Sequence, residues 1–98
     1  MRTTYGNICQ SCGMPIRRLA DFGRRIDGSV HTEYCHYCYK RGSFTDPGIS
    51  MHEKIKKNIA KARKMGISLE EAEIMAFSTI PRLRRWRKPA IHLGAILP

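Results

Sequence analysis

The chain has 98 residues, of which 42% are apolar, and 18 lysines and arginines against 8 acids give it a formal charge of +10. This length allows one domain or two very small modules and excludes the large enzyme folds. The apolar content excludes a wholly disordered basic tail, and no run approaches the roughly 18 to 20 apolar residues that cross a bilayer. We therefore expect a small folded cationic protein with no membrane span.

The first predicted module covers residues 5–46 and holds every cysteine. The cysteines form two C-x2-C pairs separated by 22 residues: Cys9 and Cys12, then Cys35 and Cys38. Two thiolates three positions apart can bind one ion from a tight turn, and two such turns complete a tetrahedral site of four sulfurs. Asp27-Gly28 is a hairpin turn signal between the pairs. The pattern predicts a zinc ribbon of short hairpins and knuckles, with one structural Zn²⁺ bound by the four cysteines.

Four cysteines in this pattern have other possible uses besides binding zinc. Two disulfides are disfavoured, because no apolar secretory segment follows Met1 and we expect a reducing, cytoplasmic environment. A redox C-x2-C would lie beside a βαβ pattern, which the sequence lacks. Iron can bind the same donors, so the spacing alone leaves zinc or iron open. A closed four-thiolate site offers no position for a reacting water, and no phosphate loop or nucleophile–base pair is present, so we predict no enzyme activity.

A first amphipathic helix is predicted to begin at Ser50, which forms a capping box with Glu53, and to end at Gly66. Its apolar positions recur at i, i+4 and i+7, namely Ile55, Ile59 and Ala62. Four lysines lie roughly opposite, at spacings of 3, 4 and 3: Lys54, Lys57, Lys61 and Lys64. Because only the apolar face can pack, we expect these lysines to face water or a partner.

A second, shorter helix is predicted after Ser68 and is ended by Pro81. Its apolar positions are Leu69, Ala72, Met75 and Ala76. Neither helix can bury its apolar face alone, so we expect a packed hairpin over residues 49–88. The predicted fold class is therefore small α+β, a four-cysteine zinc ribbon followed by a two-helix basic segment. Residues 89–98 form an apolar tail, for which docking, self-association and disorder all stay open.

The end of the helical segment gathers five cations and the only tryptophan of the chain: Arg82, Arg84, Arg85, Trp86, Arg87 and Lys88. One interpretation is a nucleic-acid contact, with arginines on phosphates and Trp86 stacked on an unpaired base. The other is that Leu83 and Trp86, three residues apart, face the core while the cations are solvated. The arginines could contact phosphate in either case.

Two functional classes follow from the charge and the aromatic residues. Residues 49–98 hold eleven cations against four acids, a net +7, whereas residues 1–48 hold seven against four. We therefore expect the helical half to bind DNA or RNA through phosphates, with little sequence selectivity because no base-reading helix is recognisable. The alternative is an adaptor for a protein partner, which would use the aromatic side chains of the ribbon: Tyr34, Tyr37, Tyr39 and Phe44.

Several longer motifs accompany the cysteine pairs. They are CQSCGMP (9–15), DFG (21–23), DGS (27–29), EYCHYCY (33–39), GSFT (42–45), EEA (70–72) and PRLRRWR (81–87). With these motifs, residues 8–88 resemble the small "putative zinc ribbon domain" proteins of bacteria and archaea. The resemblance implies a zinc module whose ligands are the four cysteines. Similar ribbons fused to transcription-regulator-like domains favour gene regulation as a context. Arg24-Arg25 and the apolar tail depart from the usual pattern of that family.

Overall fold

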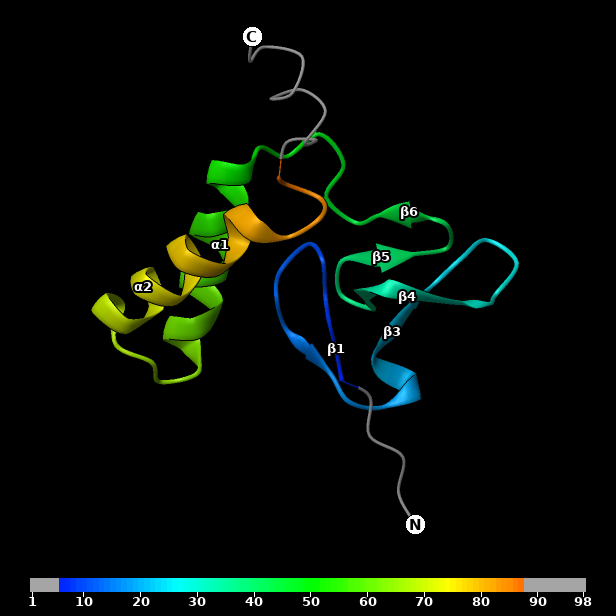
Figure 1. Ribbon diagram of the computed structural model, residues 1–98, viewed down its shortest axis with the longest axis horizontal. Coiled ribbons are helices and arrows are strands. Elements are labelled where there is room, and N and C mark those ends of the chain that lie inside the picture. Colours follow the sequence, from blue (N-terminus) through cyan, green and yellow to red (C-terminus); the bar gives the residue numbers. More distant parts are fainter. Residues whose placement is uncertain (1–5, 88–98) are drawn as a thin grey trace, which may run out of the picture.

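The computed structural model describes residues 6–87, in which a ribbon of short strands lies against two helices (Figure 1). Three antiparallel pairs make up the ribbon: β1 (Asn7–Ile8) with β2 (Pro15–Ile16), β3 (Phe22–Arg24) with β4 (Val30–Cys35), and β5 (Tyr39–Lys40) with β6 (Ser43–Phe44). The helices are α1 (Met51–Lys64) and α2 (Leu69–Thr79). The predicted small α+β architecture is confirmed.

Each cysteine pair lies in a turn that the hairpins hold in place. The first knuckle is enclosed by β1 and β2, where Ile8 pairs with Pro15, and it closes with a bond from the Cys9 amide to the Met14 carbonyl at 2.9 Å. Gly13 sits in this turn with a φ of +80°, a conformation that favours glycine. The second knuckle begins at Cys35, the last residue of β4, and leads into β5.

The predicted hairpin turn at Asp27-Gly28 connects β3 to β4. Gly28 has a φ of +87°, and the Asp27 carboxylate accepts bonds from both the amide and the hydroxyl of Ser29. The pairing shifts register between Phe22, which pairs with Cys35, and Gly23, which pairs with His31. This shift lets β4 end at the metal ligands while Phe22 stays buried beside them.

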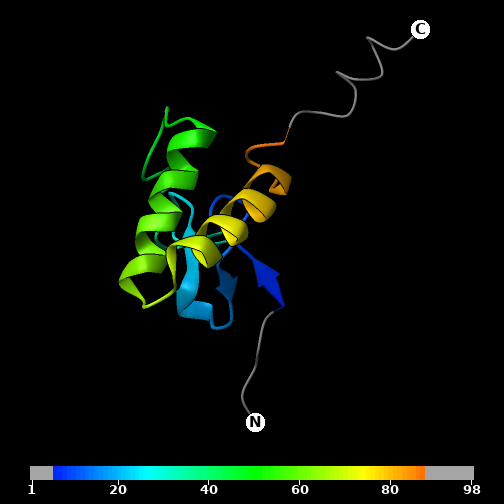
Figure 2. The same ribbon diagram turned by 90° about the vertical axis from the view of Figure 1, so that its left-hand side faces the viewer.

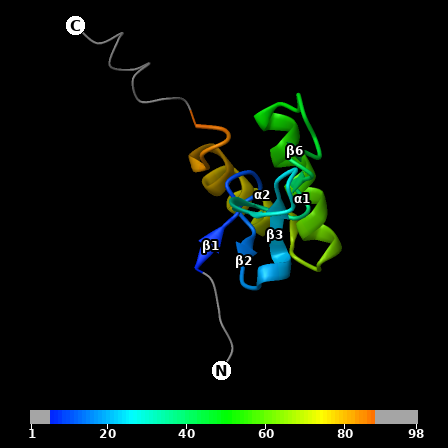
Figure 3. The ribbon, with the colours of Figure 1, turned by 90° about the vertical axis from the view of Figure 1, so that its right-hand side faces the viewer.

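The helices begin at the predicted caps. Ser50 Oγ accepts a bond from the Glu53 amide at 3.1 Å, and the Glu53 carboxylate accepts one from the Ser50 amide at 3.0 Å. Ser68 caps α2 through the Glu71 amide. Seen from the helical side, α1 and α2 cross one another in front of the ribbon (Figure 2). Seen from the opposite side, the ribbon lies in front of the two helices (Figure 3). No helix within residues 6–87 is long and apolar enough to span a membrane.

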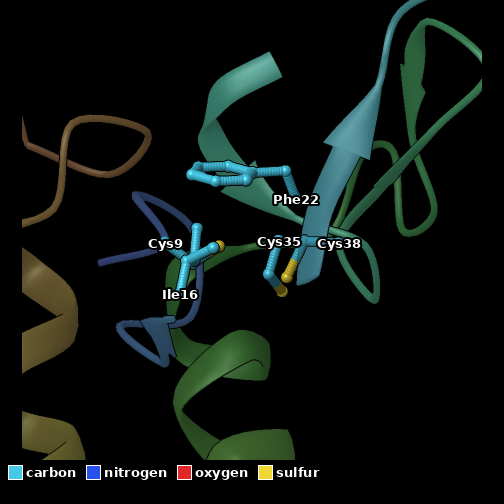
Figure 4. Packing of buried hydrophobic residues seen from close by; sticks show 5 residues of the cluster. All are labelled: Cys9, Ile16, Phe22, Cys35 and Cys38. Atoms are coloured by element: carbon cyan, nitrogen blue, oxygen red, sulfur yellow. The ribbon is translucent and has the colours of Figure 1, made fainter. Parts of the chain in front are cut away.

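The core has two clusters, one in each half. In the ribbon, three cysteines pack with Ile16 and Phe22 (Figure 4). In the helical half, the buried residues are Ile55, Ala76, Ile80 and Leu83, with Ile59 and Trp86 against them. The apolar face predicted for the second helix is only half correct, because Leu69 and Met75 are each 50% exposed. The two alanines, Ala72 and Ala76, make the buried contact instead, and so narrow a contact leaves the larger flanking side chains outside.

Helix α2 ends at Thr79, shortly before Pro81, but the chain remains helical beyond that point. The 3-10 helix η2 (Ile80–Arg82) continues directly from α2 and directs the following residues back to the ribbon. There the amides of Arg84 and Arg85 donate to the side chain and the backbone carbonyl of Gln10, at 2.8 and 3.1 Å. The last described segment therefore joins the helical half to the first knuckle.

Candidate metal centre and basic surface

The four cysteine sulfurs form one compact cluster at the meeting point of the two knuckles. All four Sγ atoms lie within 4.8 Å of one another, and those of Cys12 and Cys35 are 3.8 Å apart. Tetrahedral zinc with bonds of about 2.3 Å requires sulfurs about 3.8 Å apart. Cys9, Cys35 and Cys38 are almost fully buried, and Figure 4 shows them converging beside Phe22 and Ile16. The site can hold one zinc ion, as the sequence predicted.

The crowding of the sulfurs separates their acidities. Hydrogen bonding with Cys12 lowers the pKa of the Cys9 thiol, while hydrogen bonding with Cys35 raises the pKa of Cys12 itself. Four thiolates at this spacing would repel one another strongly without a cation among them. A divalent cation would allow all four to bind as thiolates, because metal binding displaces the thiol protons. The donor set is thus matched to a closed structural site.

Lys54 is a buried cation in direct contact with this cluster. Its side chain points toward the ribbon, where Nζ lies 3.4 Å from Cys38 Sγ and 2.8 Å from Asp46 Oδ2, and the residue is only 6% exposed. Burial alone would lower the pKa of Lys54, but Asp46 and the charge at Cys38 outweigh it, so the pKa is raised. The expectation that all four lysines of the predicted stripe face water or a partner is therefore wrong for Lys54, because α1 also packs against the ribbon with a second face.

Asp46 binds two buried cations from distant parts of the chain. Besides Lys54 on Oδ2, its Oδ1 accepts from Arg85 Nη1 at 2.9 Å, and its backbone carbonyl accepts from Arg85 Nη2 at 3.0 Å. Burial would raise the pKa of this carboxyl, but hydrogen bonds from Lys54 and Arg85 hold it below its usual value. Arg85 also donates to Ser11 Oγ and lies 3.8 Å over the Phe44 ring. It is a structural residue, and its side chain is largely buried between the knuckle and the helices.

Two further bonds connect the helical half to the first knuckle. The Trp86 indole N–H donates to the Ser11 carbonyl at 2.7 Å, and Asn58 on α1 donates to the Cys12 carbonyl at 2.7 Å. Leu83 is buried, so Leu83 and Trp86 face the core, as the packing interpretation expected. The backbone that carries the first two ligands is therefore supported from outside the ribbon.

Comparison with known proteins agrees with this geometry. A family model described as "Putative zinc ribbon domain" matches residues 8–87. The chain belongs to this family. Comparisons with curated proteins and with solved structures gave no match. The matched range includes both knuckles and the helices that support them, so family membership covers the whole described architecture.

Apart from Lys54 and Arg85, the described cations that were predicted to contact nucleic acid in this zinc ribbon protein are distributed over several surfaces. Lys57 is exposed, although it lies 3.6 Å from Asp46, and Lys64 is exposed. Lys61 extends over the Tyr37 ring, with Nζ 4.1 Å from the centroid. Arg82, Arg84 and Arg87 are exposed, and Arg84 forms a 2.6 Å ion pair with Glu33. Lys88 and the apolar tail lie outside the described residues.

Sequence reasoning missed two cations of α1. Lys56 and Arg63 are exposed and lie beside Lys57 and Lys64, on the face centred on Ala60. The sequence pattern does not reveal that α1 has a second buried face. Because Lys54, Ile55 and Asn58 all pack inside the protein, the side of the helix that faces solvent is the one with residues 56, 60, 63 and 64.

The aromatic residues considered for an adaptor role mostly contact one another. Tyr34 stacks on Tyr39 with centroids 5.5 Å apart, and both meet Phe44 edge-on. Only Tyr37 is largely exposed, at 55%. Three of the four rings therefore serve the ribbon core more than an outward face.

Proposed function

We propose that this protein is a non-enzymatic, zinc-stabilised module of the cytoplasm that binds DNA or RNA through the phosphate backbone. The observation that carries the proposal is the outer face of α1, where Lys56, Lys57, Arg63 and Lys64 are all exposed. We call this set the outer basic face. Trp86, Lys54 and Arg85 are not part of it, because each is engaged inside the protein.

The spacing of these four cations suits a phosphate chain. Residues seven apart on a helix lie on nearly the same side, about 10.5 Å apart along its axis, so the four form two adjacent pairs. Within residues 6–87, neither Lys56 nor Lys64 has an ion-pair partner. The acid on the same side, Glu53, caps the helix at Ser50 and keeps its negative charge, which the four cations of the outer basic face outnumber. The positive charge is therefore available to an external anion.

The charge of the helical hairpin is also divided unevenly between its two helices. α1 carries six cations and one acid, whereas α2 carries no cation and three acids, Glu70, Glu71 and Glu73. A polyanion would be attracted to α1 and repelled from α2, which favours one docking orientation. Because phosphates are the same for every base, such binding would show little sequence preference.

The test is the salt dependence of binding to a labelled duplex and a labelled single strand. Four phosphate contacts predict a log–log slope near −3.6 on duplex DNA. The variant with Lys56→Glu and Lys64→Glu should bind at least tenfold more weakly, and the two lost contacts should reduce the slope by about 2. The control carries the same charge change on the ribbon, at the exposed Lys40 and Arg41.

Equal weakening by both double variants would show that overall charge, and not the outer basic face, determines retention. Absence of any salt-sensitive binding at micromolar protein would contradict the nucleic-acid function itself. Both variants change only exposed side chains, so zinc content and circular dichroism should match those of the wild type.

A further inference from the structure

We propose that the junction of ribbon and helices is a docking groove for an acidic, apolar peptide segment of a partner protein. The groove has a volume of about 550 Å³ and lies between the first knuckle, α1 and α2. Its apolar lining comes from both halves of the molecule: Met14, Pro15, Tyr37, Met65, Ile67 and Met75. The surface is separate from the outer basic face and goes beyond the nucleic-acid function.

Small residues explain why a groove exists here. Ala62 on α1 and the buried Ala72 and Ala76 on α2 all line the groove, and these short side chains leave space between the helices and the ribbon. Gly13 brings the knuckle close to α2, since a Cβ at this position would lie 2.8 Å from Thr79 Cγ2. The knuckle backbone therefore meets the Thr79 side chain at one end of the groove, and larger side chains line the rest of it.

Apolar side chains at the rim are left in water. Met65 is 71% exposed, Tyr37 55% and Met75 50%. Covering such a rim would remove apolar surface from water, which stabilises a complex by roughly 25 cal/mol per Å². Methionines are unbranched and adapt to irregular partners, as they do at other peptide-binding surfaces. The lining thus suits apolar side chains presented by a short segment.

The charge of the rim selects the kind of segment. The charged side chains that line the groove are Arg17 and Lys61, both exposed, and within the described residues no carboxylate lines it. Lys61 is already placed over Tyr37 at the edge. A segment with carboxylates beside its apolar residues would gain from both cations, whereas a basic segment would be repelled. The occupant is therefore an acidic amphipathic peptide.

The test begins with a displayed library of random twelve-residue peptides, selected on the immobilised zinc-loaded protein. Variant Met75→Glu serves for counter-selection. Enrichment of apolar residues flanked by Asp or Glu supports the proposal. Enrichment of basic sequences, or of none, overturns it.

The enriched peptide is then synthesised with a fluorescent label, and its affinity is measured by anisotropy. Met75→Glu should weaken binding at least tenfold. The matched control is Ile74→Glu, because Ile74 is 63% exposed on another side of the same helix. The affinity of this variant for the peptide should stay within twofold of that of the wild type. Lys61→Glu should weaken binding of the acidic peptide and strengthen binding of the same peptide with its acids changed to lysine.

Two results would overturn the proposal even after a successful selection. Equal losses in Met75→Glu and Ile74→Glu would place the peptide elsewhere on α2. A concentration-dependent dimer in sedimentation that disappears in Met75→Glu would assign the groove to a second copy of the chain. The outcome is independent of nucleic-acid binding, because neither Met75 nor Ile74 belongs to the outer basic face.

Discussion

Replacing Lys54 by methionine removes a buried positive charge from the metal centre while keeping a side chain of similar length. Four thiolates and one Zn²⁺ carry a net charge of −2, and Lys54 Nζ lies 3.4 Å from one of the sulfurs. At an effective dielectric constant near 20, one pair of unit charges at this distance interacts by about 5 kcal/mol. Much of this attraction is offset by the desolvation of the ammonium group.

The net loss should resemble that for other groups that support metal ligands, a 10- to 100-fold drop in affinity. We therefore expect Lys54→Met to bind zinc more weakly by about 1.4 to 2.7 kcal/mol. Competition against a chromophoric chelator measures this directly. Faster alkylation of the cysteines in the zinc-loaded variant should accompany it, because the bound thiolates lose a hydrogen-bond donor.

The matched control is Lys57→Met. Lys57 also approaches Asp46, at 3.6 Å, but it is exposed and its only described ion pair is with that carboxylate. Its removal should leave the affinity for zinc within threefold. If Lys54→Met and Lys57→Met bind zinc equally well, the argument that Lys54 stabilises the thiolates is refuted.

Two further predictions concern stability. Asp46→Ala leaves Lys54 and Arg85 buried without their carboxylate, so the free energy of unfolding of the zinc-loaded protein should fall by about 3 to 5 kcal/mol. The control Arg84→Ala removes an exposed ion pair with Glu33 and should lower the free energy of unfolding by only about 0 to 1 kcal/mol. Both values are measured by urea denaturation, and equal losses in the two variants would contradict the claim that the buried pairs of Asp46 matter more. Removing the metal with a chelator should abolish hydrogen-exchange protection over residues 7–44 and also reduce the helical circular dichroism, because α1 and Trp86 rest on the first knuckle. Helices that keep their full signal after zinc removal would show that they fold independently.

Local features of the fold could be predicted from the sequence because each depends on neighbouring residues. The Ser50 capping box needs only residue 53, and the turn at Gly28 needs only a residue that accepts a positive φ. The cysteine cluster could also be predicted, although its pairs are distant in the chain. A C-x2-C turn offers two ligands, and a four-coordinate ion then requires a second turn.

The contacts between the two halves could not be predicted, because no local pattern specifies them. Arg85 and Asp46 are 39 positions apart, and Trp86 and Ser11 are 75 apart. A helical periodicity identifies one apolar face, and it correctly placed Ile55 inside. It gives no sign that the ribbon covers a second face, so it places Lys54 toward water or a partner and does not single out Lys56 and Arg63.

The position of Asp46 bears on any attempt to divide the protein. It lies just before Pro47-Gly48, where the change in composition marks the natural place to cut, yet its partners Lys54 and Arg85 both lie beyond the cut. A fragment ending at residue 48 would keep every cysteine but lose the cation beside Cys38 and the donors on Ser11. Such a fragment would carry the complete ligand set with an altered electrostatic environment. Affinities measured on it would describe a different metal site from that of the full chain.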